Sequence, residues 1–191
     1  MQDIKVGDVR DFSNYMSAVI DARSFAKQKE AIAAAQASPD AEVVIGGGCD
    51  DSTGWFVQPT VIVAKDANYD SMKRELFGPI LSVYVYDDAD LEEAIDLCAN
   101  GSEYALTGAI FAQDRLTINM LSERLRFAAG NFYVNDKPTG AVVGQQPFGG
   151  SRASGTNDKA GSILNLIRWV SPRTIKETFV PATDWRYPFL G

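Results

Sequence analysis

The chain offers few side chains that could carry covalent chemistry on their own. It contains two cysteines and no histidine, which excludes a Ser-His or Cys-His nucleophile pair and the usual zinc ligand sets. Cys49 follows three glycines in a predicted turn. Cys98 shares a predicted apolar helix face with Leu91, Ala94 and Ile95. We predict structural roles for both thiols, and we assign no catalytic nucleophile and no metal site.

Two other stretches have the composition of ligand-binding segments. Glu75 precedes a Phe-Gly-Pro turn, where a carboxylate can accept two charge-assisted hydrogen bonds from a diol. Residues 144–161 (GQQPFGGSRASGTNDKAG) hold five glycines and a proline just after a predicted strand. Taken alone, Glu75 is more simply interpreted as a solvated acidic residue in a charged run, and the glycine-rich stretch has the alternative of a solvent loop. The run Gly46–Gly48 lacks the later glycine and helix start of a phosphate loop, and we interpret it as a plain turn.

Composition narrows the class of partner. The net charge of −7 disfavours nucleic acid and anionic lipid surfaces. No stretch reaches the roughly 18 apolar residues of a membrane span, and the first residues have no apolar signal core. We therefore expect a soluble intracellular protein with no nucleic-acid partner, no membrane contact and reduced cysteines.

Hydrophobic periodicity predicts alternating helices and strands in one α/β domain. Residues 80–86 are nearly continuous in apolar and β-branched types, as in a central strand of a parallel sheet. A helix over 21–36 should bury Ala22, Phe25, Ala26, Ile32 and Ala33. The remaining expected strands are 42–45, 55–57, 60–63, 107–112 and 131–135, and the remaining expected helices lie near 87–100, 114–126 and 162–169.

The end of the chain has a different pattern. Residues 171–180 alternate polar and apolar types, with Ile175 and Phe179 among the apolar ones, which predicts a half-buried strand. A lone terminal strand is exposed unless it joins another sheet, so we expect it to pair with a second subunit.

The order of several short motifs resembles the aldehyde dehydrogenase superfamily. These motifs are residues 75–79 (ELFGP), 131–135 (NFYVN), 146–150 (QPFGG) and Ser154-Gly155. Within that superfamily, residues 135–140 (NDKPTG), 143–150 (VGQQPFGG) and 153–159 (ASGTNDK) are similar to the family of 1-pyrroline-5-carboxylate dehydrogenases. The resemblance spans nearly the whole chain and implies NAD-dependent oxidation of L-glutamate γ-semialdehyde to L-glutamate, in proline catabolism.

The resemblance also implies roles for individual residues. Glu75 would hold the nicotinamide ribose of NAD, and Phe77 would lie beside the cofactor. Main-chain N–H groups of Gly140 and Ala141 would receive the α-carboxylate of the substrate, as adjacent N–H groups can. Phe148 would form an apolar wall over the aliphatic part of the substrate.

In that superfamily the cofactor domain and the catalytic cysteine precede the region matched here, so the chain is expected to be inactive alone. Residues 1–170 would be the C-terminal part of a parallel-sheet catalytic domain, and residues 171–191 an oligomerisation strand and tail. The partners implied are the aldehyde and either identical subunits or the N-terminal part. A truncated, non-catalytic protein that pairs with a full-length homologue is the alternative, and complementation by a separate N-terminal polypeptide is a third. NADP stays open, and the implied compartment is the cytoplasm, or the mitochondrial matrix in a eukaryote.

Overall fold

The computed structural model describes residues 1, 3–138, 140–142 and 144–190. The chain forms two compact units, one of Met1–Gly140 with Gly149–Asn157 and one of Ala141–Phe148 with Asp158–Gly191. Thr139 and Val143, which belong to the motifs quoted above, and Gly191, in the expected tail, lie outside the described residues.

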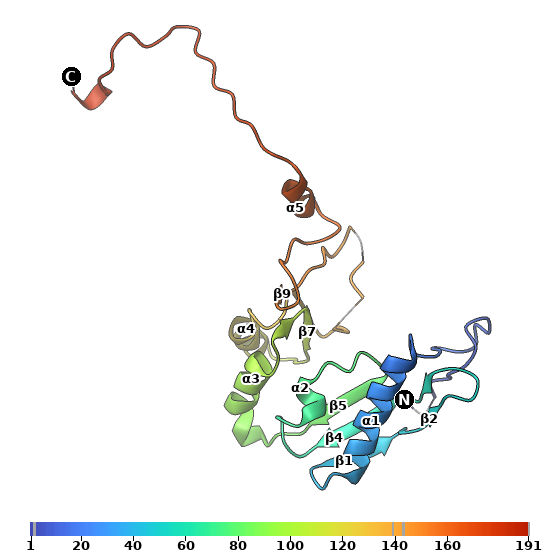
Figure 1. Cartoon of the computed structure of the whole chain (residues 1–191). Coiled ribbons are helices and arrows are strands. Elements are labelled where there is room, and N and C mark those ends of the chain that lie inside the picture. Colours follow the sequence, from blue (N-terminus) through green and yellow to red (C-terminus); the bar gives the residue numbers. More distant parts are fainter. Residues whose placement is uncertain (2, 139, 143, 191) are drawn as a thin grey trace. The chain divides into compact units, whose positions relative to one another are not determined.

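The first unit contains a three-stranded sheet covered on one face by a long helix (Figure 1). Its strands are β1 (Ala41–Ile45), β4 (Thr60–Ala64) and β5 (Ile80–Tyr84), in the order β1-β4-β5. β4 runs antiparallel to β1 and parallel to β5, with Thr60 opposite Ile80 and Ala64 opposite Tyr84. The most buried strand is therefore β4, in which four of five residues are buried.

The position of β5 corrects the prediction that it is a central strand. β5 is an end strand of this sheet, and Val85 and Tyr86 beyond it are exposed. Its run of β-branched residues favours a strand without fixing how many neighbours the strand has.

The covering helix is α1 (Ala22–Ala37), which begins where the Asp21 side chain accepts a hydrogen bond from Ser24 N–H at 2.7 Å. Its buried residues are Phe25, Gln28, Ala31, Ile32 and Ala35. Phe25 and Ile32 pack with Val57, and Ala35 packs with Ala41 and Ile62. The prediction was right for Phe25 and Ile32 and wrong for Ala22, Ala26 and Ala33, which are exposed. In an alanine-rich helix the small side chains define the buried face poorly.

A strand-helix-strand unit follows, as predicted. β7 (Thr107–Ile110) pairs in parallel with β8 (Asn131–Val134), and α4 (Arg115–Arg124) connects them. α3 (Leu91–Asn100) contributes Ile95 to a core with Ile110, Ile118 and Leu125. The prediction that Cys98 lies in the core is wrong, because Cys98 is exposed and borders a recess of about 310 Å³ between α3 and Tyr84.

Short elements complete the first unit. The one-turn helix α2 (Asp70–Lys73) precedes β5, and a 3₁₀ turn (Asp88–Asp90) precedes α3. The two-residue strands β2 (Cys49–Asp50) and β3 (Phe56–Val57) form an antiparallel hairpin, and β6 (Tyr104–Ala105) pairs with β9 (Ser151–Arg152).

The second unit has little regular structure. It contains α5 (Ile163–Leu166) and two 3₁₀ turns, Ile167–Trp169 and Pro188–Leu190. Residues 171–180 are all exposed and form no strand with any described part of the chain. The half-buried strand expected there is therefore absent from the single chain, while pairing with a second subunit stays a prediction.

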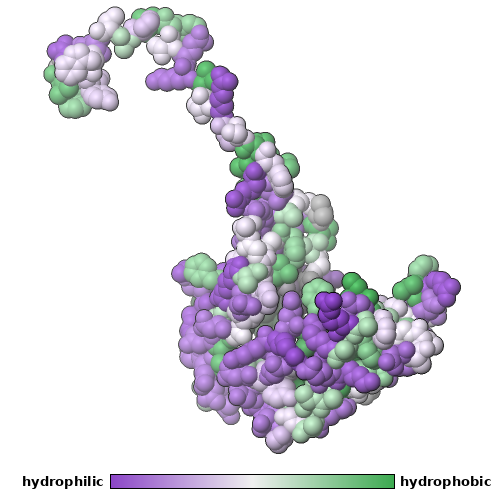
Figure 2. Space-filling model, viewed as in Figure 1, coloured by the Kyte–Doolittle hydropathy of each residue, from purple (hydrophilic) through white to green (hydrophobic). Residues whose placement is uncertain are grey.

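Apolar side chains reach the surface in both units (Figure 2). Phe12 and Ile20 are exposed in the first unit, and Phe179, Val180 and Trp185 in the second. Within the described residues, no helix combines the length and the hydrophobicity that a membrane crossing requires.

We expect Ile62→Ala to destabilise the first unit by about 2–5 kcal/mol, because Ile62 is fully buried on β4 and its truncation leaves a cavity. The control is Leu81→Ala on β5, a residue that is 53% exposed, which should cost about 1 kcal/mol or less. Urea unfolding followed by circular dichroism measures the free energy of unfolding of both variants. An equal decrease in the two variants would contradict the central position of β4 in the sheet.

Candidate functional site

The turn that carries Glu75 and Phe77 is fixed at both ends. On one side, Arg74 N–H donates to the Asp70 carbonyl at 2.8 Å and closes α2. On the other, Thr60 N–H donates to the Pro79 carbonyl at 2.8 Å, which ties the turn to β4 where β5 begins. Leu76, between the two predicted cofactor residues, is buried. The turn therefore has an apolar anchor at its centre and main-chain hydrogen bonds at its ends.

The side chains of Glu75 and Phe77 both face solvent. Glu75 is exposed, and its carboxylate makes no hydrogen bond or ion pair with any described residue. The neighbouring cation Arg74 lies 3.0 Å from Asp70 and 3.7 Å from Glu30, so its charge is shared by other carboxylates. The Glu75 oxygens thus remain available to accept hydrogen bonds from a ligand, as a ribose diol would require.

Phe77 has an unusual backbone for its type. Its φ is 58°, in the left-handed region, and the residue is 80% exposed. A non-glycine residue in this region costs of order 1–3 kcal/mol unless its surroundings hold it there. Such strain concentrates at ligand-binding sites, and here it turns an aromatic face outward.

The segment after β8 is tied to the end of β7 through one side chain. Asn135 Oδ1 accepts from Ala112 N–H, and Asn135 Nδ2 donates to the Ala112 carbonyl, both at 2.9 Å. Asn135 has φ 55°, so the chain leaves the sheet there. This two-hydrogen-bond clamp fixes where the segment that leads to Gly140 starts, a role that the sequence did not predict.

Gly140 has the backbone freedom that its predicted role needs. Its φ is +91°, which an L side chain rarely adopts, and a Cβ there would lie 3.3 Å from Lys137 Cε. Gly140 belongs to the first unit, and Ala141 and Phe148 belong to the second. Their joint action on one carboxylate therefore remains a prediction.

Phe148 is half-buried within the second unit. It forms an antiparallel bridge with Ala160, in which Phe148 N–H donates to Ala160 O at 2.9 Å and Ala160 N–H donates to Phe148 O at 2.7 Å. In the first unit, Gly149 N–H donates to Asn131 Oδ1 at 3.1 Å. The main chain on both sides of Phe148 is thus hydrogen-bonded.

Neither cysteine has the environment of an activated nucleophile. Burial raises the pKa of Cys49, although the charge of Lys29 acts in the opposite direction. Partial desolvation of its thiol also raises the pKa of Cys98, although the residue as a whole is exposed. A raised pKa lowers the fraction of thiolate, which is the nucleophilic form. In the part of the chain that the structure describes, no group of three or more His, Cys, Asp or Glu side chains could hold a metal ion.

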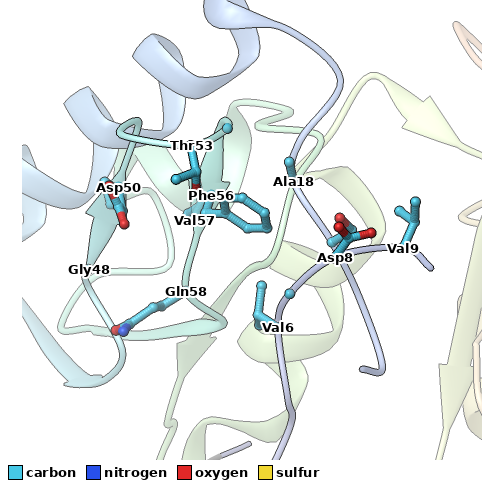
Figure 3. Close-up of a pocket in the computed structure, with 14 residues that line it drawn as sticks. Val6, Asp8, Val9, Ala18, Gly48, Asp50, Thr53, Phe56, Val57 and Gln58 are labelled. Carbon is cyan, nitrogen blue, oxygen red and sulfur yellow. The ribbon is translucent and has the colours of Figure 1, made fainter. Parts of the chain in front are cut away.

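A broad cleft of about 730 Å³ in the first unit is lined by none of the predicted site residues (Figure 3). It is bordered by Val6–Val9 on one side and by the β2–β3 hairpin, with Cys49, Asp50 and Phe56, on the other. Its carboxylate Asp8 already pairs with Arg10 at 2.6 Å. The cleft carries no convergent set of polar groups with an evident ligand, so its size alone does not make it the functional site.

The model of the aldehyde dehydrogenase family matches residues 1–175, and the chain belongs to that family. Within it, the chain is 58% identical over 190 residues to the mitochondrial delta-1-pyrroline-5-carboxylate dehydrogenase of Dictyostelium discoideum, covering 100% of this chain and 34% of that protein. Against the mitochondrial human enzyme of the same name, the identity is 52% over 188 residues, covering 98% of this chain and 33% of the relative. The resemblance inferred from the motifs is confirmed.

Solved structures agree with the sequence relatives. The NAD-bound delta-pyrroline-5-carboxylate dehydrogenase of Mycobacterium tuberculosis is 55% identical with a TM-score of 0.82, covering 99% of this chain and 34% of that one. The NAD-bound 1-pyrroline-5-carboxylate dehydrogenase from Thermus is 32% identical with a TM-score of 0.75, covering 87% of this chain and 31% of that one. These likenesses confirm the aldehyde dehydrogenase type of α/β fold. The chain spans about a third of the length of the relatives it matches.

We expect both thiols to react slowly with a disulfide reagent at neutral pH and faster as the pH rises past the ordinary thiol value of about 8.5. The reason is that a raised pKa leaves little thiolate at pH 7. The single variants Cys49→Ser and Cys98→Ser separate the two rates. Rapid modification of either thiol at pH 7 would contradict the structural role assigned to it.

Proposed function

We propose that this chain supplies the C-terminal part of the catalytic domain of an NAD-dependent dehydrogenase that oxidises L-glutamate γ-semialdehyde to L-glutamate. The observation that carries the proposal is the Glu75–Pro79 turn, which presents an unpaired carboxylate and an exposed aromatic ring on a fixed main chain. The proposal is supported by relatives named delta-1-pyrroline-5-carboxylate dehydrogenase, to which this chain is more than 50% identical.

In the proposed enzyme, Glu75 accepts hydrogen bonds from the two ribose hydroxyls on the nicotinamide side of NAD. Phe77 lies against the cofactor and limits its positions. The bound nicotinamide supplies the hydride acceptor, and the residues of this chain orient it. The turn fits this task because its carboxylate is free while its main chain is held by α2 and β4.

Substrate recognition in this proposal depends on main-chain groups. The main-chain N–H groups of Gly140 and Ala141 donate hydrogen bonds to the substrate α-carboxylate, and Phe148 excludes water from the aliphatic carbons of the substrate. The nucleophilic cysteine and the rest of the cofactor site come from polypeptide outside this sequence. We propose residues 1–170 as catalytic-domain chain and residues 171–191 as the oligomerisation segment and tail.

A second candidate function follows from the exposed alternating segment 171–180. In that case the chain is a non-catalytic protein that pairs with a full-length homologue through this segment. NADH formation separates the candidates when this chain is assayed alone and with a polypeptide that carries the upstream cysteine. NADH formation in the mixture but not by this chain alone supports the dehydrogenase. If neither assay forms NADH and the two polypeptides associate, the result supports the pairing protein.

We expect Glu75→Gln, made in the protein that contains this chain together with the upstream cysteine, to raise the Michaelis constant for NAD about 10- to 100-fold. A charge-assisted hydrogen-bond acceptor is worth about 1.5–3 kcal/mol, and glutamine keeps the shape but not the charge. The matched control is Glu93→Gln, an exposed carboxylate on α3, which should leave the constant unchanged. Steady-state NADH formation measures both, and equal effects would refute the ribose contact.

We expect Ile175→Asp to weaken subunit association, because a charge on the apolar face of a pairing strand must be desolvated on assembly. The control is Lys176→Ala, the neighbouring residue of the opposite face, which should associate like the native chain. Sedimentation velocity over a range of concentrations measures the difference. Unchanged association in Ile175→Asp would remove the segment from the interface.

A further inference from the structure

Gln28 is a polar residue in an apolar position. It lies on α1 three residues after Phe25 and four before Ile32, both buried, and its own exposure is 0%. A buried amide is unfavourable unless its polar atoms are hydrogen-bonded, so an apolar side chain would serve packing alone better. Packing alone therefore does not explain why a glutamine occupies this buried position.

The Gln28 amide contacts the turn that carries Glu75 and Phe77. Gln28 Nε2 donates to the Phe77 carbonyl and lies at the same distance, 3.3 Å, from Ser24 Oγ. Its Oε1 is buried and has no hydrogen-bond partner among the described residues. Among the described residues, the hydrogen bond that links Gln28 to a part of the chain outside α1 is therefore the one to the Phe77 carbonyl.

The absence of a side chain at Gly78 leaves the space that the Gln28 amide occupies. A Cβ built on Gly78 would lie 1.8 Å from Gln28 Nε2 and 2.0 Å from Oε1. No side chain fits at Gly78 unless the amide moves. The two residues are therefore complementary, with a glycine in the turn opposite a buried amide on the helix.

The strained backbone of Phe77 needs such a support. Its φ of 58° is unfavourable for a residue with a side chain, and its exposed ring makes little packing that could hold it. The hydrogen bond to its carbonyl and the close contact at the next residue act on the main chain directly. Next to them, Lys27 Nζ donates to the Glu75 carbonyl at 3.2 Å.

We propose that Gln28 is a positioning residue for NAD binding, which acts by holding the Phe77–Gly78 main chain in the conformation that directs the Glu75 carboxylate and the Phe77 ring. This inference rests on the proposed function, because it takes Glu75 and Phe77 as the cofactor contacts. Gln28 itself does not touch the cofactor. Its effect should therefore appear in the affinity for NAD and not in that for the aldehyde.

The test uses Gln28→Met, which keeps the length and flexibility of the side chain and removes the N–H donor. Gln36→Met is the matched control, since Gln36 is exposed on the same helix. The first readout is amide hydrogen exchange of Leu76, Phe77 and Gly78 in this chain, which requires no cofactor. Exchange should rise about three- to tenfold in Gln28→Met, the size of one lost neutral hydrogen bond, and stay unchanged in the control.

The second readout is steady-state kinetics in the protein that contains this chain together with the upstream cysteine. Gln28→Met should raise the Michaelis constant for NAD about three- to tenfold and leave that for the aldehyde unchanged. Gly78→Ala, at an exposed turn, displaces the same amide from the other side and should give the same pattern if Gln28→Met fails to fold.

The outcomes separate the two proposals. Absence of NAD-dependent oxidation in the native protein refutes the proposed function, and the exchange data still test the support of the turn. With an active native protein, unchanged exchange or an unchanged NAD constant overturns the role of Gln28. An equal rise in both Michaelis constants overturns it too, because it indicates general destabilisation.

Discussion

The parallel pairing of β4 with β5 is the constraint on which the candidate cofactor turn depends. Thr60 begins β4 fully buried, and its N–H group holds the Pro79 carbonyl at the point where the turn enters β5. The Thr60 hydroxyl donates to Gln58 O at 2.7 Å and accepts from Gly47 N–H at 3.0 Å. One buried residue therefore links the glycine turn, the central strand and the candidate site. Because α1 packs on the same sheet, the turn is held between a strand and a helix.

The features predicted correctly from the sequence are those that depend on residues close together in the chain, such as helix positions and the order of helices and strands. Helices form in the predicted regions 21–36 and 114–126, and the strand-helix-strand order of β7, α4 and β8 follows from periodicity. Predictions of burial and strand pairing, which depend on residues far away in the sequence, were less reliable. The number of neighbours of β5, the burial of Cys98 and the state of residues 171–180 depend on what packs against them. Gln28 had a signal, namely a polar residue at an apolar helix position, but its partner in the turn is 49 residues away.

Motif identity located the candidate site better than composition did. Taken alone, Glu75 is an exposed acid in a charged run, and nothing in its type separates a ribose ligand from a solvated side chain. The structure adds physical content through its surroundings, since Arg74 is engaged with Asp70 and Glu30 and leaves Glu75 unpaired. Gly140 and Ala141 offer less, because the main-chain recognition predicted for them leaves no side-chain chemistry for a sequence pattern to reveal.

The acidic character of the chain bears on how it would recognise an anionic substrate. With a net charge of −7, this chain does not attract a carboxylate over long range, so recognition by its own groups would depend on short-range donors. Main-chain N–H groups supply such donors without a mobile cation, and they act only where the backbone is held in one conformation. Asn135 restrains only the start of the segment that leads to Gly140, through its two hydrogen bonds to Ala112. The same logic applies at the candidate cofactor turn, where the buried Gln28 amide and Gly78 constrain the main chain. In both places specificity would arise from backbone geometry that side chains of other elements enforce.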